Sequence, residues 1–437
     1  MTKPLQEHAE NWDLRHEDFN DHDFLYDVYA VMRRNAPFAR TDKPFLSATP
    51  SGAWVAVRYA ECVKILQDWE HFSSNPTPEG AEQLAGNLVI TLDPPRQQKF
   101  RKVLNPYFSP ARMKALRPEI AAETDRLLDD FIESGSGDLA QIAWRQPGVV
   151  FFKYLLGMPI EDVPLCVELT DTALNGATEQ ERMGAWGGLY QHLHDAVTAR
   201  MEQPPRDDMI DVLLSAEIDS EKLSFGDVVS NAMLLVQAGL ETTASAMSFA
   251  YHYLATNSAE RDRLTGDPEL IARAVEEFIR FAGSIHGIPR TIAKNVELSG
   301  CTFRPGESVI VNYAAANRDE QEFPEAGRCI LDRRDNRHLG FGAGVHRCLG
   351  SNLARLEFQV GLERVLMRIP DFTLAPGAQA TFHGNSVTRG FRSVPVVFTP
   401  APRSTSGVAP PRTVAAGDDE GGNPCGSRSP EGTARSR

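Results

Sequence analysis

Cys348 lies in the glycine-rich string FGAGVHRCLG, residues 341–350, and a helical pattern begins directly after it at Ser351. At a helix N-terminus the helix dipole and the free backbone N–H groups favour thiolate over thiol, and the neighbouring Arg347 adds a positive charge. The glycines let the chain turn tightly and let a bulky planar group approach the backbone. A thiolate held in this way suits an axial metal ligand.

Three other interpretations of this loop compete with a metal ligand. A zinc site needs about four ligands, and one cysteine with one histidine falls short of that number. A dinucleotide site is excluded, since the glycines do not follow the order G-x-G-x-x-G and no buried strand precedes them. A buried, inert cysteine in a glycine-rich loop stays open, and it is the interpretation that the cysteine taken alone favours.

A helical pattern runs from Ser224 to about Thr256, and its start has the spacing of a capping box, with Asp227 three residues after the serine. At ~1.5 Å per residue this helix spans roughly 50 Å. Its middle, AGLETT at residues 238–243, places a glycine and two threonines where a long helix prefers good helix formers. Threonine hydroxyls bond back to the preceding turn and bend a helix, and Gly239 leaves bare backbone beside the bend. The string predicts a groove for a flat or small ligand, with an ordinary helix as the alternative.

Glu277 and Arg280 are three residues apart in another helical pattern, and they therefore lie on one helix face. This spacing predicts a charge-assisted pair between the two side chains. A solvent-exposed surface pair is the alternative.

The composition of the whole chain excludes several classes of protein. With 437 residues, 42% of them hydrophobic and 24% charged, the chain has material for a large core and is neither disordered nor fibrous. The net charge of −14 argues against a general nucleic-acid binder. Residues 1–21 carry charges throughout, so we expect neither a signal peptide nor a membrane anchor. The six cysteines form no C-x-x-C pair, which predicts reduced thiols in the cytoplasm.

The patterns predict one large, mostly α-helical domain with small β-sheets. Residues 401–437 are rich in Pro, Gly, Ser and Arg, which predicts a disordered tail without a catalytic part. We divide the chain into an N-terminal extension at 1–20, a domain at 21–400 and this tail, because no linker or repeat interrupts the middle. Strand-like runs, several of them bounded by Gly or Pro, occur at 53–58, 296–299, 302–303, 308–312 and 394–398.

These motifs together resemble the cytochrome P450 superfamily in its bacterial, soluble form. Residues 341–350 resemble its haem-binding loop F-x-x-G-x-x-x-C-x-G, residues 238–242 its A-G-x-[DE]-T segment, and 277–280 its E-x-x-R helix. Two further stretches match in order and spacing, so that the resemblance covers about residues 20 to 400. They are Asn317-Arg318-Asp319 with Phe323-Pro324, and Asp93-Pro94-Pro95 with Arg101.

The resemblance implies the cytochrome P450 fold, with a long central helix over haem b and with Cys348 as the ligand of the iron. It also implies that Arg101, Arg290 and His346 hold the haem propionates, with Gln97 donating a further hydrogen bond. The other residues expected at the haem are Phe341, Gly342, Gly350, Ala238 and Gly239. Structural support is expected from Glu277 and Arg280 with a third residue, Arg333; Arg334 stays possible because residues 329–332 depart from the family's usual Phe-Asp opening.

The activity that the resemblance implies is a monooxygenase that inserts one oxygen atom of O2 into a lipophilic molecule, as in natural-product hydroxylation. Thr242 is expected to hold the water chain that delivers protons, and Glu241 to relay them from solvent. Epoxidation, desaturation and oxidative coupling remain alternatives on the same fold. A haem protein that only senses or carries a ligand is the alternative from another class.

By the same resemblance, the substrate pocket is expected to be lined mostly by apolar residues. His286 and Thr91 are each expected to supply one orienting hydrogen bond. The substrate-contacting residues that we predict are Val89, Ile90, Leu234, Ala238, His286 and Ile288.

The electrons must come from another protein, because the sequence has neither a flavin nor an iron–sulfur fingerprint. The resemblance implies a ferredoxin with its NAD(P)H-dependent reductase. An acidic ferredoxin suits a basic patch on the cysteine side of the molecule. The residues of this predicted patch are Arg96, Lys99, Arg101, Lys102, Arg112, Lys114 and Arg347.

Overall fold

The computed structural model describes residues 4–43, 52–76, 88–176, 178–384 and 387–404. Contacts group Met1–Arg403 into one compact unit. The predicted tail falls almost wholly outside the described residues, although its first residue, Ala401, donates a backbone hydrogen bond to the carbonyl of Ile132 at 3.2 Å.

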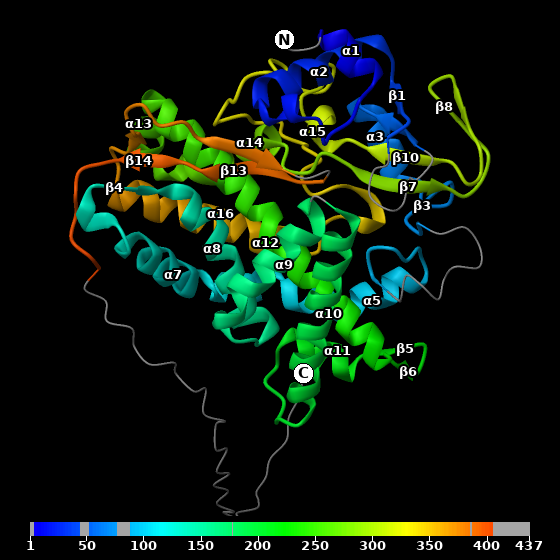
Figure 1. Cartoon of the computed structure of the whole chain (residues 1–437), viewed down its shortest axis with the longest axis horizontal. Helices are drawn as coiled ribbons and strands as arrows, with labels where there is room; N and C mark the ends of the chain where they lie inside the picture. Colours follow the sequence, from blue (N-terminus) through cyan, green and yellow to red (C-terminus); the bar gives the residue numbers. More distant parts are fainter. Residues whose placement is uncertain (1–3, 44–51, 77–87, 177, 385–386, 405–437) are drawn as a thin grey trace, which may run out of the picture. The chain divides into compact units, whose positions relative to one another are not determined.

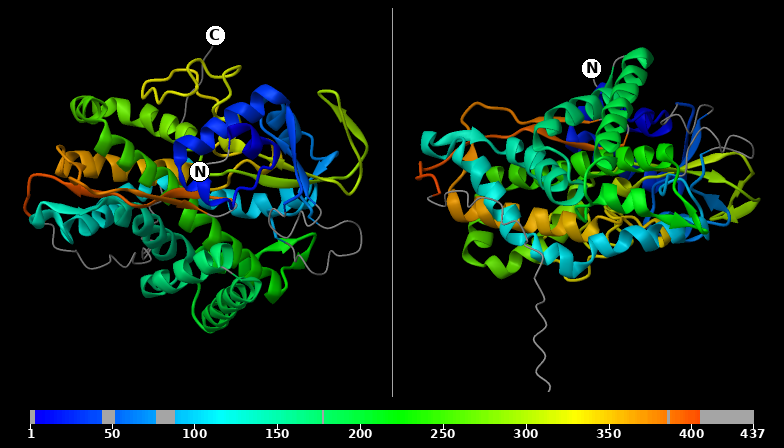
Figure 2. Two further views of the ribbon diagram at one scale, coloured as in Figure 1. Left: turned by 45° about the horizontal axis from the view of Figure 1, so that its top comes forward. Right: turned by 90° about the horizontal axis from the view of Figure 1, so that it is seen from below.

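Helices make up most of the unit, as the sequence predicts (Figure 1). Figure 2 shows α16 running beside α14 and α7. All three helices are far apart in sequence. The α-helices are α1 Leu5–Glu10, α2 His22–Asn35, α3 Tyr59–Gln67, α5 Arg96–Leu104, α6 Pro110–Ala115, α7 Arg117–Asp129, α8 Leu139–Phe151, α9 Val163–Asn175, α10 Glu179–Met201, α11 Met209–Ser215, α12 Phe225–Thr256, α13 Ser258–Gly266, α14 Ile271–Ala282, α15 Tyr313–Ala316 and α16 Ser351–Arg368.

The strands form small sheets, of which the largest has five strands in the order β1-β2-β10-β7-β3. In this sheet β10 pairs in parallel with β2 and antiparallel with β7, where Val309 lies opposite Arg290. The strands are β1 Phe38–Thr41, β2 Ala53–Ala56, β3 Phe72–Ser73, β4 Ser136–Asp138, β5 Glu217–Ile218, β6 Glu221–Lys222, β7 Ile288–Ile292, β8 Val296–Leu298, β9 Cys301–Phe303, β10 Ser308–Val311, β11 Thr373–Leu374, β12 Thr381–Gly384, β13 Arg389–Ser393 and β14 Pro395–Val397. Each strand-like run of the sequence coincides with one of them.

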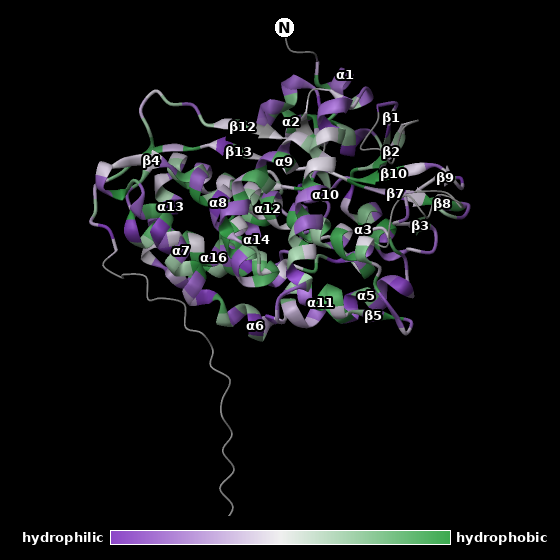
Figure 3. Cartoon of the chain, turned by 60° about the horizontal axis from the view of Figure 1, so that its bottom comes forward, coloured by the Kyte–Doolittle hydropathy of each residue, from purple (hydrophilic) through white to green (hydrophobic). Residues whose placement is uncertain are grey.

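The long helix α12 is the centre of the helical part and packs against α8, α10, α14, α16 and β13. Its N-cap is Ser224, whose hydroxyl accepts a hydrogen bond from the backbone N–H of Asp227 at 3.1 Å, as the capping-box spacing predicts. Hydrophobic residues gather on α12 and α8 in the interior, while hydrophilic residues face outward on helices such as α7 (Figure 3). No helix in the described part of the chain is both long enough and apolar enough to cross a membrane.

Residues 5–20, which the sequence assigned to an N-terminal extension, pack onto the rest of the unit. Trp12 and Phe19 are only 1% and 0% exposed. The guanidinium of Arg389 on β13 donates hydrogen bonds to the backbone carbonyls of Phe19 (2.7 Å) and Leu14. This segment therefore belongs structurally with the elements around β13.

Candidate active site

A cavity lies between α12 on one side and the cysteine loop with the start of α16 on the other. It encloses about 1590 Å³, its opening to solvent included. The structure brings most of the predicted site residues together in the lining of this one cavity. Those residues are Cys348, His346, Arg101, Arg290, Phe341, Gly342, Gly350, Ala238, Gly239, Thr242, Val89, Ile90, Leu234 and Ile288.

Hydrogen bonding and glycine conformations shape the cysteine loop. The backbone N–H of Cys348 donates to the carbonyl of Phe341 at 2.8 Å and closes the loop. Gly344 has φ +67°, and a side chain there would collide with the backbone of Leu66 on α3, so that position requires glycine. The loop is thus pressed against α3 with its sulfur facing the cavity.

Desolvation by the surrounding protein atoms raises the pKa of the Cys348 thiol, although the residue is exposed to the cavity. The backbone N–H of Gly350 and the positive charges of Arg101 and Arg347 lower this pKa, as the sequence suggests for the helix N-terminus and Arg347. The protein groups alone therefore favour the thiol. A metal cation bound at the sulfur would favour the thiolate.

Cationic and polar groups line one edge of the cavity and suit the propionates of haem b. Arg101 donates to the carbonyl of Arg347 at 2.7 Å and Arg290 to that of Pro289 at 2.8 Å. Among the described residues, neither guanidinium is ion-paired with a carboxylate. The buried Nε2 of His346 has no hydrogen-bond partner. Two carboxylates would satisfy all three groups, so the donor set fits this cofactor.

Two physical details refine the predicted cofactor contacts. Burial lowers the pKa of His346 to about 4 in the absence of a ligand, whereas two carboxylates beside it would raise that pKa. Gln97 does not line the cavity, contrary to its predicted place beside the haem. Its amide N–H donates to the carbonyl of Val345 at 2.6 Å, so its visible role is to tie α5 to the cysteine loop.

On α12, the hydroxyl of Thr242 donates to the carbonyl of Ala238 at 3.1 Å, the back-bond that the sequence predicts. Both residues line the cavity. Gly239 lines it too, and a Cβ at this position would lie 3.1 Å from the ring of Phe151 on α8. The glycine thus makes room for an aromatic ring as well as for a ligand, which local sequence does not reveal.

Glu241 does not line the cavity, although it adjoins Thr242 in sequence. Its carboxylate is buried and accepts a hydrogen bond from the Thr388 hydroxyl at 2.8 Å. Arg392 on β13 lies 3.7 Å from the same carboxylate and 3.0 Å from that of Asp171, whose side chain is 45% exposed. A chain of polar groups thus joins Glu241 to the surface.

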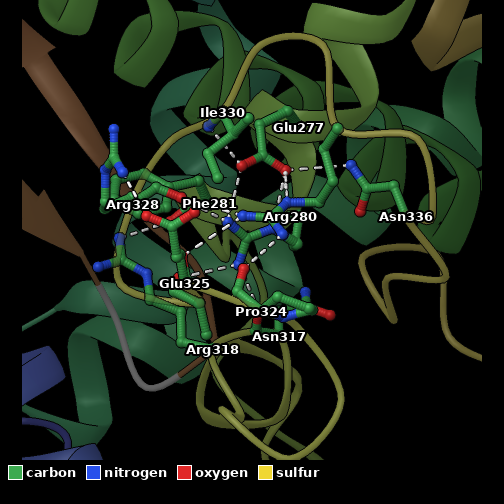
Figure 4. A network of polar contacts seen from close by, with 12 residues as sticks. Glu277, Arg280, Phe281, Asn317, Arg318, Pro324, Glu325, Arg328, Ile330 and Asn336 are labelled. Atoms are coloured by element: carbon green, nitrogen blue, oxygen red, sulfur yellow. Dashed lines mark hydrogen bonds and ion pairs between the residues drawn. The ribbon is translucent and has the colours of Figure 1, made fainter.

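Glu277 and Arg280 are fully buried and form a two-pronged ion pair, with N–O distances of 2.7 and 2.8 Å (Figure 4). The Arg280 guanidinium also donates to the carbonyls of Asn317, Ala326 and Arg328. Arg333 donates to the Glu277 carboxylate at 3.0 Å, which places this arginine and not its neighbour in the third position. The network fixes the segment that leads into the cysteine loop.

A second ion-pair network near the loop escaped the sequence analysis. Glu276 accepts hydrogen bonds from Arg355 on α16 at 2.6 and 2.9 Å and contacts His338 at 3.0 Å. Burial raises the pKa of this carboxyl, but both partners outweigh that effect and lower it to about 2. The Arg355 guanidinium lies 4.3 Å from the centre of the Phe341 ring. Because the partners are 62 to 79 residues apart, no local pattern announces them.

Most of the residues predicted to contact the substrate line the cavity. Val89, Ile90, Leu234 and Ile288 line the cavity, but His286 does not, which corrects its assignment as a substrate contact. Its ring is fully buried and its Nδ1 lies 2.9 Å from the hydroxyl of Tyr29 on α2. A histidine on this turn was expected to face inward, but packing against α2 turns it away.

The predicted hydrogen bond from Thr91 also lies elsewhere, since its hydroxyl donates to the carbonyl of Leu88 at 3.1 Å. Ser284, and not Thr91, offers a free hydroxyl to a ligand in the cavity. It lines the cavity, and its hydroxyl is buried without a hydrogen-bond partner. A buried, unpaired hydroxyl costs free energy unless a ligand satisfies it.

Tyr313 and Glu357 also line the cavity, and the sequence analysis did not single them out. Burial raises the pKa of Tyr313 to about 12 and raises that of Glu357 well above its usual range. Glu357 is 2% exposed, and its Oε1 has no partner. Tyr313 therefore stays neutral at pH 7, and burial favours the protonated form of Glu357. The only hint in the sequence is that Glu357 falls on the helix that follows Cys348.

The family model described as Cytochrome P450 matches residues 173–379. The chain is 32% identical to the mycinamicin IV hydroxylase/epoxidase of Micromonospora griseorubida, over 85% of this chain and 94% of that protein. It is also 32% identical to the vitamin D(3) 25-hydroxylase of Pseudonocardia autotrophica, over 85% and 93% of the two chains.

Solved structures agree in fold. A mutant of P450 EryK in complex with erythromycin B superposes with a TM-score of 0.79 at 28% identity, over 89% of this chain and 99% of that one. A myxobacterial cytochrome P450 in complex with myristic acid gives 0.79 at 32% identity, over 88% and 98%.

Fold, cavity and donor set together define a haem-thiolate oxygenase. The chain belongs to the cytochrome P450 family, and it is a monooxygenase that uses haem b and O2 on lipophilic substrates.

Proposed function

We propose that this chain hydroxylates a lipophilic natural product or steroid by inserting one oxygen atom of O2. One observation carries the proposal: a single apolar cavity has the Cys348 sulfur on one side and the Thr242 hydroxyl of α12 on the other. The related mycinamicin enzyme is named for both hydroxylation and epoxidation. Epoxidation is therefore the alternative outcome to look for among the products.

Each group around the cavity has a proposed part in this reaction. Haem b, when bound, supplies the activation of O2. Cys348 would hold its iron, and Arg101, Arg290 and His346 would hold its propionates. Phe341, Gly342 and Gly350 would border the ring, with Ala238 and Gly239 leaving space above it.

Proton delivery is proposed to pass along α12. The Thr242 hydroxyl would order water in the cavity, and the buried Glu241 carboxylate would relay protons from solvent. The Thr388 hydroxyl and Arg392 contact the Glu241 carboxylate, and Arg392 also contacts the partly exposed Asp171. The Arg392 guanidinium stays protonated, so protons would travel through water beside these groups, and their position supports such a route toward the surface.

The substrate is proposed to be an apolar molecule with one hydroxyl or carbonyl oxygen near the cofactor. Val89, Ile90, Leu234 and Ile288 would contact its hydrocarbon body. The unpaired hydroxyl of Ser284 would bind its oxygen.

Electrons are proposed to come from an acidic ferredoxin and an NAD(P)H-dependent ferredoxin reductase. The exposed cations Arg96, Lys102, Lys114 and Arg347 support a docking surface on the cysteine side. Two other members of the predicted patch are partly neutralised, since Lys99 pairs with Asp219 and Arg112 with Asp207.

The location is proposed to be cytoplasmic. The support is chemical: Cys62, Cys166, Cys301, Cys329 and Cys348 are free thiols, which a reducing compartment maintains. We also propose that residues 21–400 are the catalytic domain and that residues 401–437 take no part in the reaction.

The test is the spectrum of the haem-loaded protein, reduced and exposed to carbon monoxide. The wild type should give the strongly red-shifted Soret band of thiolate ligation, and Cys348→Ser should lose it. Cys301→Ser, a partly exposed cysteine outside the cavity, is the matched control and should keep the band. An unshifted band in the wild type would refute the site.

Turnover tests the reaction itself. The wild type, supplied with a ferredoxin, its reductase and NADPH, should convert a member of a macrolide and steroid panel to a product heavier by one oxygen atom. NADPH consumption without any oxygenated product across the panel would contradict the proposed substrate class.

A further inference from the structure

Three potential metal ligands meet near the N-terminus, far along the chain from the cavity residues. His8 lies on α1, His16 caps the short helix η1 (Glu17–Asn20), and Asp18 lies within η1. One ligand atom from each of the three side chains lies within 4.8 Å of the others. The monooxygenase reaction uses none of these residues.

The distances suit one small cation. The Oδ2 of Asp18 lies 3.0 Å from the Nε2 of His8 and 3.6 Å from the Nδ1 of His16. Ligands at ~2.0–2.1 Å from a tetrahedral zinc ion are roughly 3.3 Å apart. The two distances to Asp18 therefore need to change by only a fraction of an ångström around a bound ion. The ligand nitrogens of the two histidines, which lie within 4.8 Å of each other, would move closer together.

The hydrogen bonds show which nitrogen of His16 carries no proton. The backbone N–H of Asp18 donates to the Nδ1 of His16 at 3.2 Å, so this nitrogen is unprotonated. An imidazole nitrogen has one lone pair, so zinc at Nδ1 would replace this hydrogen bond. The Oδ2 of Asp18, 3.6 Å from the same nitrogen, offers an anionic ligand beside it.

The ligands combine a rigid wall with access to solvent. The His8 side chain is 4% exposed, and its ring packs against those of Phe19 and Phe24 with centres 5.3 and 5.2 Å away. The side chains of His16 and Asp18 are 33% and 21% exposed. An ion can therefore enter from solvent, and a water molecule can complete its coordination.

We propose that His8, His16 and Asp18 form a zinc site with three protein ligands and one water. Two imidazoles and one carboxylate are the donor set of several zinc sites, whereas Ca²⁺ and Mg²⁺ prefer oxygen ligands alone. On binding, His8 would carry its ring proton on Nδ1, which leaves the lone pair of Nε2 for the ion.

The site links two pieces of the N-terminal segment. A bound ion fastens α1 to η1, and Arg389 holds the adjacent carbonyl of Phe19 at 2.7 Å. Arg389 belongs to β13, which packs against α12. Zinc is thus expected to stabilise the packing of residues 5–20 on the catalytic unit, without touching the cavity.

The experiment titrates zinc chloride into full-length, haem-loaded protein from which chelator has removed metals, followed by calorimetry. The wild type should bind one zinc per chain with micromolar or tighter affinity, and its melting temperature should rise. His16→Gln and Asp18→Asn should each weaken binding at least tenfold. Both residues are partly exposed, so these variants should keep the wild-type haem spectrum.

The matched control is His71→Gln. His71 contacts Asp68 at 2.9 Å in the same kind of histidine–aspartate pair, but in the described part of the chain that pair has no third ligand. This variant should bind zinc like the wild type. The absence of saturable zinc binding by the wild type would overturn the proposal. Wild-type affinity for zinc in both His16→Gln and Asp18→Asn would overturn it as well. So would X-ray absorption showing sulfur ligands, since that would assign the zinc to cysteines.

Discussion

Ser284 is the residue at which the structure says most about substrate choice. Its hydroxyl is buried in the cavity lining without a partner. Satisfying such a group with a ligand oxygen contributes about 1 kcal/mol. Ser284→Ala should therefore weaken binding of an oxygenated ligand roughly 3–10-fold and leave binding of its hydrocarbon parent unchanged.

Testosterone and androstane form a suitable pair of probes, and the shift of the haem Soret band reports binding of each. Thr91→Ala is the control, since that hydroxyl bonds to the Leu88 carbonyl and not to the cavity. Equal loss of affinity for both steroids in Ser284→Ala would mean that the serine acts through packing and not through a hydrogen bond.

For single residues, the sequence predicts the chemical role of a side chain better than the direction in which that side chain points. Cys348 and Arg290 reach the cavity because strong local constraints, a glycine loop and a strand register respectively, fix their orientation. Gln97 and His286 turn away because of contacts with Val345 and Tyr29, which are 248 and 257 residues distant. Side-chain direction at such positions depends on tertiary packing, which a single sequence does not display.

Glu277 organises a whole element, since its carboxylate accepts hydrogen bonds from Arg280, Arg333, Asn336 and the backbone of Ile330. Removing one partner of a fully buried pair leaves the other charge uncompensated, at a cost of about 3–5 kcal/mol. Glu277→Ala should therefore lower the melting temperature sharply and reduce haem content. Glu277→Gln keeps part of the hydrogen bonding, so its melting temperature and haem content should fall less. This variant serves as the test if Glu277→Ala fails to fold.

Arg328→Ala provides the matched control. Its side chain pairs with Glu325, but the two are 71% and 57% exposed. Exposed pairs contribute about 0–1 kcal/mol, so stability and haem content should stay near the wild-type values. A loss as large as that of Glu277→Ala would show that the meander segment, and not the buried charge, determines stability.

Among the features of whole elements, the sequence reveals where helices begin and which residues share a helix face. The three-residue spacing of Glu277 and Arg280 and the cap at Ser224 are local, and both appear as predicted. The network of Glu276, His338 and Arg355 is assembled from three separate segments and leaves no periodic signal. The packing of residues 5–20 went unpredicted for the same reason, because its partner Arg389 is distant in sequence.

Over the whole molecule, the fully buried His286 and the half-buried His22 and His252 should make stability fall in mild acid. Burial is the main cause that lowers the pKa of His22 and His286, and it lowers that of His252 to about 4. The charges that bear on them are those of Asp23, Arg318 and Arg389. His346 lines the cavity, where a bound cofactor would change its pKa.

The sign follows from proton linkage. The unfolded chain protonates these histidines near pH 6.5 while the folded chain resists, so the unfolded state binds more protons below that pH and stability decreases as the pH falls. Each histidine contributes at most about 1.4 kcal/mol per pH unit. Between pH 6.5 and 5.5 each histidine would cost up to about 1 kcal/mol. The three together would therefore cost up to ~3 kcal/mol, or roughly 3–4 °C in melting temperature for a chain of this size.

Melting curves of the haem-loaded protein between pH 7.5 and 5.5 measure this loss. In His252→Phe the drop in melting temperature over this pH range should be smaller by about one third, because one of the three histidines that take up a proton is removed. Phenylalanine is the suitable replacement, since the histidine ring already stacks on Phe391 with centres 4.0 Å apart. A melting temperature constant over this range would mean that the folded protein takes up the protons, and that water reaches the interface between α2, α12 and β13.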